Sequence, residues 1–159
     1  MQPEEKPNTV TLYHGTDSVN ARQILKDGAI KPDVSKWDVT LYMPSKGTAL
    51  MSQSQEPGYV YATPFLDTAK AYAFVKSIYY RVPKSHSFWV EAWSCTFIKR
   101  GSVYRPESKP AVIEFEYPLD IGVSPDSESM AGIRIKGPIP VESIKTILPV
   151  LSYPEKFVL

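Results

Sequence analysis

The chain has 159 residues, 43% of them hydrophobic and 22% charged, with a formal net charge of +1. This composition is typical of one globular domain and excludes a strongly basic surface spread over the whole protein. The single cysteine, Cys95, excludes an internal disulfide and a cysteine-built metal site, and two histidines cannot complete a usual zinc site.

No apolar run reaches the roughly 18 residues of a membrane-spanning helix. The polar, acidic start MQPEEKPN does not resemble a signal peptide. We therefore expect a cytoplasmic protein, or an effector secreted into a target cell. Residues 1–8 are predicted to be a flexible N-terminal tail, and residues 9–159 a single domain.

The start of the chain predicts a strand followed by a helix. Residues 9–16, TVTLYHGT, alternate in polarity and are rich in strand-forming side chains. Residues 18–28 predict a helix, because Asp17 or Ser18 can cap its first turn and Gly28 is a typical stop.

The middle of the chain predicts a long loop, a strand and a second helix. Residues 29–57 lack periodicity over a length that is typical of a binding loop or lid. Residues 58–63 predict a short buried strand, and residues 66–80 a helix whose alanines allow close packing. The remaining strands are predicted at residues 87–99, 110–117, 132–137 and 144–153.

This order of elements predicts the fold class. Strand, helix, loop, strand, helix and then several strands indicate an α+β fold and not a repeated βαβ unit. No Gly-rich phosphate-binding motif follows a predicted strand, so the sequence excludes a Rossmann or P-loop nucleotide site.

The stretch 12-LYHGT-16 is the first candidate site. His14 near a strand end can present an imidazole to a ligand, and Gly15 lets a ligand approach the backbone closely. The structural alternative is a histidine held by a hydrogen bond inside the core.

Two tyrosines form the second candidate site. Tyr61 lies near the end of a predicted strand, and Tyr72 lies in the helix that follows it. Two aromatic rings from adjoining elements can stack on both faces of a flat ligand ring. The alternative is that both rings fill the core with their hydroxyl groups tethered.

The third candidate is 129-SMAGIRIKGPIP-140, which predicts a short strand with a Gly-Pro stop. A carboxylate at the start of this strand would face the same cleft as the other two candidates, and the sequence has Ala131 there.

Taken in order, these three stretches resemble the His-Tyr-Glu class of ADP-ribosyltransferases, the group that includes diphtheria toxin and the poly-ADP-ribose polymerases. The first motif of that family is similar to LYHGT, and its second to GYVYATPFLDTAKAYA. Its third region, in which a catalytic Glu opens a strand, is similar to IRIKGPIPVESIKTI. The resemblance implies a split β-sheet fold, with two small, mainly antiparallel sheets flanked by helices.

The resemblance also implies a role for each matching residue, with NAD as co-substrate and no metal. His14 would hydrogen-bond the ribose next to nicotinamide, Gly15 would hold the carboxamide through its backbone, and Thr16 would be a nearby polar contact. Tyr61 and Tyr72 would stack on the nicotinamide ring.

The chain departs from the family at the catalytic carboxylate, since Ala131 stands where Glu is expected. That Glu would stabilise the positive charge that builds on the ribose when the nicotinamide bond breaks. Three hypotheses explain the departure. Ala131 is an engineered Glu→Ala change, the protein is a natural pseudoenzyme, or Glu128 replaces the lost carboxylate. We favour the engineered change because the other motifs are intact. A solvated loop charge is the alternative for Glu128.

The expected activity is mono-ADP-ribosyl transfer to a macromolecule, protein or nucleic acid, with release of nicotinamide. The small size is typical of a bacterial or phage toxin or effector, and the family implies an antitoxin or immunity protein as partner. The alternative function is a catalytically inactive binding module.

Overall fold

The computed structural model of the chain describes residues 8–32, 38–43, 48–54, 58–83, 87–90, 95–99, 103–118, 123–125 and 133–150. Within these residues the protein is α+β, with small antiparallel sheets, as the sequence predicts. The helical segments are α1 (Ser18–Asp27), α2 (Leu66–Arg81) and the short 3-10 helix η2 (Val141–Ser143). The strands are β1 (Thr9–Asp17), β2 (Ala29–Ile30), β3 (Asp38–Met43), β4 (Thr48–Ser54), β5 (Tyr59–Ala62), β6 (Ser87–Val90), β7 (Cys95–Lys99), β8 (Pro110–Pro118), β9 (Val123–Pro125), β10 (Ile133–Lys136), β11 (Ile139–Pro140) and β12 (Ile144–Pro149).

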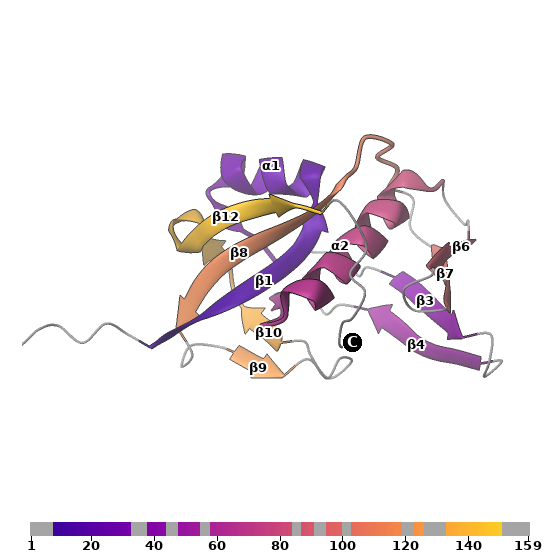
Figure 1. The fold of residues 1–159 in the computed structure, drawn as a ribbon, viewed down its shortest axis with the longest axis horizontal. Coiled ribbons are helices and arrows are strands. Elements are labelled where there is room, and N and C mark those ends of the chain that lie inside the picture. Colours follow the sequence, from indigo (N-terminus) through magenta and orange to yellow (C-terminus); the bar gives the residue numbers. More distant parts are fainter. Residues whose placement is uncertain are drawn as a thin grey trace, which may run out of the picture.

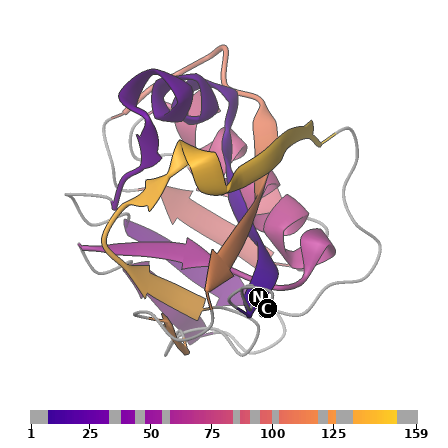
Figure 2. The ribbon, with the colours of Figure 1, turned by 90° about the vertical axis from the view of Figure 1, so that its left-hand side faces the viewer.

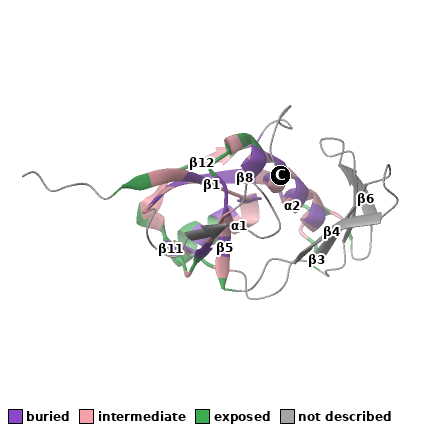
Figure 3. Ribbon diagram, turned by 90° about the horizontal axis from the view of Figure 1, so that it is seen from below, coloured by how far each residue is buried: buried purple, intermediate pink, exposed green. Residues whose placement is uncertain are grey.

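The described strands form separate antiparallel sheets. Their orders are β1-β8-β12, β5-β10-β9, β4-β3-β7-β6 and the short pair β11-β2. Helix α2 packs on β1 and β8 (Figures 1 and 3), and the four-stranded sheet lies on the other side of this helix in Figure 1. Helix α1 lies above β1 and β8 in both ribbon views (Figures 1 and 2).

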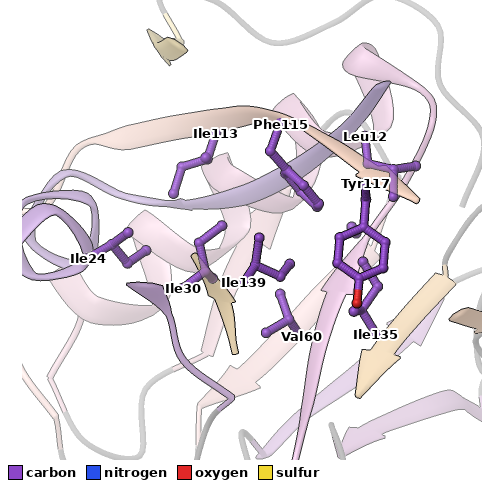
Figure 4. Close-up of a cluster of buried hydrophobic side chains, with 10 residues drawn as sticks. Leu12, Ile24, Ile30, Val60, Ile113, Phe115, Tyr117, Ile135 and Ile139 are labelled. Carbon is purple, nitrogen blue, oxygen red and sulfur yellow. The ribbon is translucent and has the colours of Figure 1, made fainter. Parts of the chain in front are cut away.

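The main core lies between the β1-β8-β12 sheet and the β5-β10-β9 sheet. Leu12 and Phe115 enter it from the first sheet, and Val60 and Ile135 from the second, all four at most 2% exposed. Figure 4 shows these side chains meeting in one layer, joined by Ile24 of α1 and by Ile30 and Ile139 of the β2–β11 pair. Burying apolar area in this layer holds the two sheets together.

Helix α1 begins and ends as its sequence predicts. The Asp17 carboxylate accepts a hydrogen bond from the Asn20 N–H (2.9 Å), so Asp17 is the N-cap. At the other end Gly28 takes a left-handed conformation (φ 81°), and its N–H donates to the Ile24 carbonyl.

Two predictions about the strands need correction. The loop or lid predicted at residues 29–57 is wrong, because β2, β3 and β4 lie within that range. The predicted strand 87–99 is two strands, β6 and β7, which pair with each other antiparallel. Strand β3 pairs with its neighbour β4 and with the distant β7, and β7 pairs with its neighbour β6. Local periodicity does not report such pairing between strands.

Three side chains connect the strands of the β1-β8-β12 sheet across one face. The Glu116 carboxylate of β8 contacts the Lys145 ammonium of β12 (2.6 Å) and accepts a hydrogen bond from the Thr11 hydroxyl of β1 (2.5 Å). Hydrogen bonding to Lys145, then to Thr11, lowers the pKa of Glu116 from 4.5 to about 2.

A pH dependence of stability follows from this lowered pKa. Since the folded pKa lies below the unfolded value, the contribution of Glu116 is complete above about pH 4.5 and is lost as the pH falls towards 2. We expect Glu116→Gln to lower the free energy of unfolding at pH 6 and to have almost no effect near pH 2, as measured by urea titration. In a Lys145→Met background the effect at pH 6 should shrink, and a loss that is equal at both pH values would contradict the assignment.

Candidate functional site

A cavity of about 280 Å³ opens between β1, α1 and β5. Three residues that the sequence analysis selected line it together: His14 and Thr16 from β1, and Tyr61 from β5. The other lining residues are Asn20, Gln23, Ile24, Asp27, Ala29, Ile30, Lys31, Pro32, Tyr59, Val60 and Lys76. The cavity is therefore mostly polar on the α1 side and aromatic on the β5 side.

The His14 imidazole is oriented by the backbone of β5. Its Nδ1 lies 2.6 Å from the Tyr61 carbonyl oxygen. A carbonyl oxygen only accepts, so Nδ1 carries the hydrogen and donates it. In a neutral ring, Nε2 is then an acceptor, which suits a ligand hydroxyl. The hydrogen bond to Tyr61 thus fixes both the ring position and the tautomer.

This contact sits where β1 and β5 diverge. Tyr13 and Thr63 exchange two backbone hydrogen bonds, of 2.8 and 2.9 Å, in an isolated bridge. A continued antiparallel ladder would pair Gly15 with Tyr61 next. Among the described residues no such pair forms, and the Tyr61 carbonyl accepts from His14 instead. The separation of the two strands creates the cavity.

Thr16 lies at this cavity with an unsatisfied hydroxyl group. The residue is 1% exposed, and Oγ1 has no hydrogen-bond partner among the described residues. Leaving a buried hydroxyl unpaired costs free energy. Thr16 therefore places an unsatisfied polar atom in the wall of the cavity.

The unpaired hydroxyl of Thr16 has a measurable consequence for stability. Thr16→Val keeps the shape and removes no hydrogen bond, so we expect the free energy of unfolding to stay within about 0.5 kcal/mol or to rise. The matched control is Thr63→Val, because buried Thr63 Oγ1 accepts from the Phe65 N–H at 3.2 Å. That variant should lose about 1 kcal/mol. Urea unfolding of both variants is the measurement, and equal losses would show that Thr16 has a partner in solution.

Gly15 and Tyr72 meet at helix α2. A β-carbon added to Gly15 would lie 2.4 Å from the Ala69 carbonyl oxygen and 3.1 Å from the Tyr72 β-carbon. The α-carbon of Gly15 therefore faces α2, while its N–H and C=O point along the same strand edge as those of Tyr13, towards β5. Tyr72 does not line the 280 Å³ cavity; its β-carbon lies on the α2 side of Gly15.

The two candidates for the catalytic carboxylate position, Ala131 and Glu128, lie outside the described residues. The strand that follows them, β10, pairs with β5, and its Arg134 stands opposite Tyr61. The third motif of the sequence analysis therefore leads into a strand next to the cavity wall.

Polar residues of α1 were not selected from the sequence. Asn20, Gln23 and Asp27 line the cavity from one side of this helix. Their spacing, three and four residues apart, places them on one face of the helix. This polar face is the feature of the sequence that could have identified them as candidate site residues. Two basic residues, Lys31 and Lys76 of α2, also line the cavity.

No protein-family model, curated protein or solved structure matched this chain in the comparisons. No described helix has both the length and the apolar character needed to cross a membrane. Within the described ranges, no three histidine, cysteine or acidic side chains are grouped as metal ligands.

Proposed function

We propose that this protein is an NAD-dependent mono-ADP-ribosyltransferase of the His-Tyr-Glu class. The observation that carries the proposal is the convergence of His14, Thr16 and Tyr61 on one cavity, with the imidazole oriented by the Tyr61 carbonyl. These residues come from two motifs that lie 45 or more positions apart in the sequence, and the family resemblance requires both at one site.

The size and chemistry of the cavity suit one end of a dinucleotide. Its volume of about 280 Å³ lies just below the range of ligand pockets, which is roughly 300–1,000 Å³. In our proposal it accommodates the nicotinamide–ribose half of NAD⁺. His14 binds a ribose hydroxyl, Tyr61 provides an aromatic wall, and the strand edge at Gly15 offers an N–H donor and a C=O acceptor to the carboxamide.

The proposed reaction breaks the bond between nicotinamide and ribose and forms a bond from the same ribose carbon to an acceptor nucleophile. Nicotinamide leaves, and the acceptor loses one proton. Positive charge builds on the ribose during this exchange, so a carboxylate at position 131 would accelerate it. With Ala131 the present chain is expected to bind NAD⁺ and to turn it over poorly.

NAD⁺ titration of the present chain by calorimetry tests the binding half of the proposal. We expect saturable one-site binding that His14→Ala weakens at least about fivefold, because a polar contact contributes roughly 1–3 kcal/mol. Lys26→Ala is the control, since Lys26 is exposed and does not line the cavity. Absence of NAD⁺ binding by the unmodified chain would refute the proposal.

The acceptor is proposed to be a macromolecule, protein or nucleic acid, and the protein a toxin or effector with a neutralising antitoxin or immunity partner. Its proposed place of action is the cytoplasm of its own cell or of a cell into which it is secreted. Labelled NAD⁺ added to a lysate with an active form would identify the acceptor by mass.

A further inference from the structure

The loop before β8 joins the two helices through one arginine. The backbone N–H of Arg105 donates to the Tyr80 carbonyl at the end of α2 (2.6 Å), and its guanidinium lies 4.4 Å from the centre of the Tyr80 ring. On the α1 side, Nη1 donates to Asn20 Oδ1 (2.9 Å) and lies 3.7 Å from Asp17 Oδ1. Arg105 therefore spans from the last turn of α2 to the first turn of α1.

The contact with Arg105 determines how the Asn20 carboxamide is oriented. A guanidinium has donors and no acceptor, so it faces Oδ1 and not Nδ2. The Asn20 backbone N–H is already bonded to Asp17. Nδ2 makes no hydrogen bond to another described residue, and Asn20 lines the cavity. The two N–H donors of the carboxamide are thus available to a ligand.

The buried Asp17 carboxylate keeps Arg105 in place. Asp17 is fully buried, and its second oxygen accepts from the Ser108 hydroxyl (2.6 Å), in the same loop as Arg105. Without Arg105 the buried Asp17 carboxylate would lose the positive charge next to it, which is unfavourable. The other partner of Arg105, Asn20, lies in the wall of the cavity. The loop thus contacts both the buried Asp17 carboxylate and the Asn20 side chain of the cavity.

We propose that Arg105 is a positioning residue for the cavity: it holds the Asn20 carboxamide with its N–H donors towards an acceptor atom of the bound ligand. Arg105 does not line the cavity and acts through Asn20. The proposal that the ligand is NAD⁺ is the proposed function above, and the orientation of Asn20 can be tested without it.

Selective ¹⁵N labelling of asparagine gives the direct measurement, because the chain has one other asparagine, the exposed Asn8. In Arg105→Met we expect the Asn20 side-chain NH₂ signals to move towards those of a mobile amide, with Asn8 unchanged. Arg22→Met removes an exposed cation from α1 and should leave both unchanged. Unmoved Asn20 signals in Arg105→Met would overturn the proposal, whether or not NAD⁺ binds.

The ligand half of the test is a double-mutant cycle with NAD⁺. Arg105→Met should weaken NAD⁺ binding roughly tenfold, as expected for loss of an oriented hydrogen-bond donor. In an Asn20→Ala background the same change should have no further effect. Fully additive losses of affinity would show that Arg105 does not act through Asn20. If Arg105→Met does not fold, Arg105→Lys carries the same test, because lysine keeps the charge but lacks the planar fork.

If the unmodified chain does not bind NAD⁺, the proposed function fails, and the Asn20 signals still decide whether Arg105 orients the carboxamide.

Discussion

Replacing Ala131 by Glu is expected to raise the rate of nicotinamide release by on the order of 10²–10³, the typical effect of one well-placed electrostatic group. The physical reason is that the charge of the carboxylate stabilises the ribose more in the transition state than in bound NAD⁺. Nicotinamide release by Ala131→Glu and by the present chain, at saturating NAD⁺, is the measurement.

Ala131→Gln is the matched control, because it adds a side chain of nearly the same shape without the charge. We expect it to restore much less activity than Glu. If NAD⁺ binds both chains and Ala131→Glu releases no more nicotinamide, the protein is a binding module. Residual activity of the present chain that disappears in Glu128→Gln would support Glu128 as the substitute carboxylate.

Gly15→Ala is expected to destabilise the fold by about 2–3 kcal/mol, as overpacking in a close contact typically does. The added β-carbon would lie 2.4 Å from the Ala69 carbonyl oxygen and 3.0 Å from the Ala73 nitrogen. Both are backbone atoms of α2, so the strand and the helix must separate to make room. Urea unfolding measures the loss.

Gly28→Ala is the control that separates the free-energy cost of close packing from the cost of a strained backbone conformation. Gly28 has a positive φ of 81° and nothing within 4 Å of an added β-carbon. Its substitution should cost only the left-handed strain of about 1–2 kcal/mol. A loss for Gly15→Ala that is smaller than for Gly28→Ala would show that β1 and α2 are not in close contact in solution.

The locally encoded elements could be predicted from the sequence. Alternation predicts β1, and the cap at Asp17 and the stop at Gly28 define α1. The α+β class follows from the order of such elements. Strands β3 and β4 could not be predicted from local pattern. Strand β3 pairs with β7, which lies more than fifty residues later, and Leu41 stands opposite Phe97 in this pairing.

The candidate site was predicted in part. His14, Thr16 and Tyr61 were selected from short motifs, and the structure places them at one cavity. Asn20 and Arg105 were not selected, because a hydrogen bond between residues 85 positions apart has no local signature. The close approach of Gly15 to α2 could likewise not be predicted from the sequence, since it depends on how a helix packs across a sheet.

The position of His14 has a consequence for mutagenesis. Its Nδ1 donates to the Tyr61 carbonyl, the backbone group that a continued β1–β5 ladder would pair with Gly15. In His14→Ala this hydrogen bond is lost, and the N–H of Gly15 is the β1 group that a continued ladder would bring to the Tyr61 carbonyl. We expect such pairing to narrow the cavity, so that His14→Ala would remove the proposed ligand contact and also change the shape of the site.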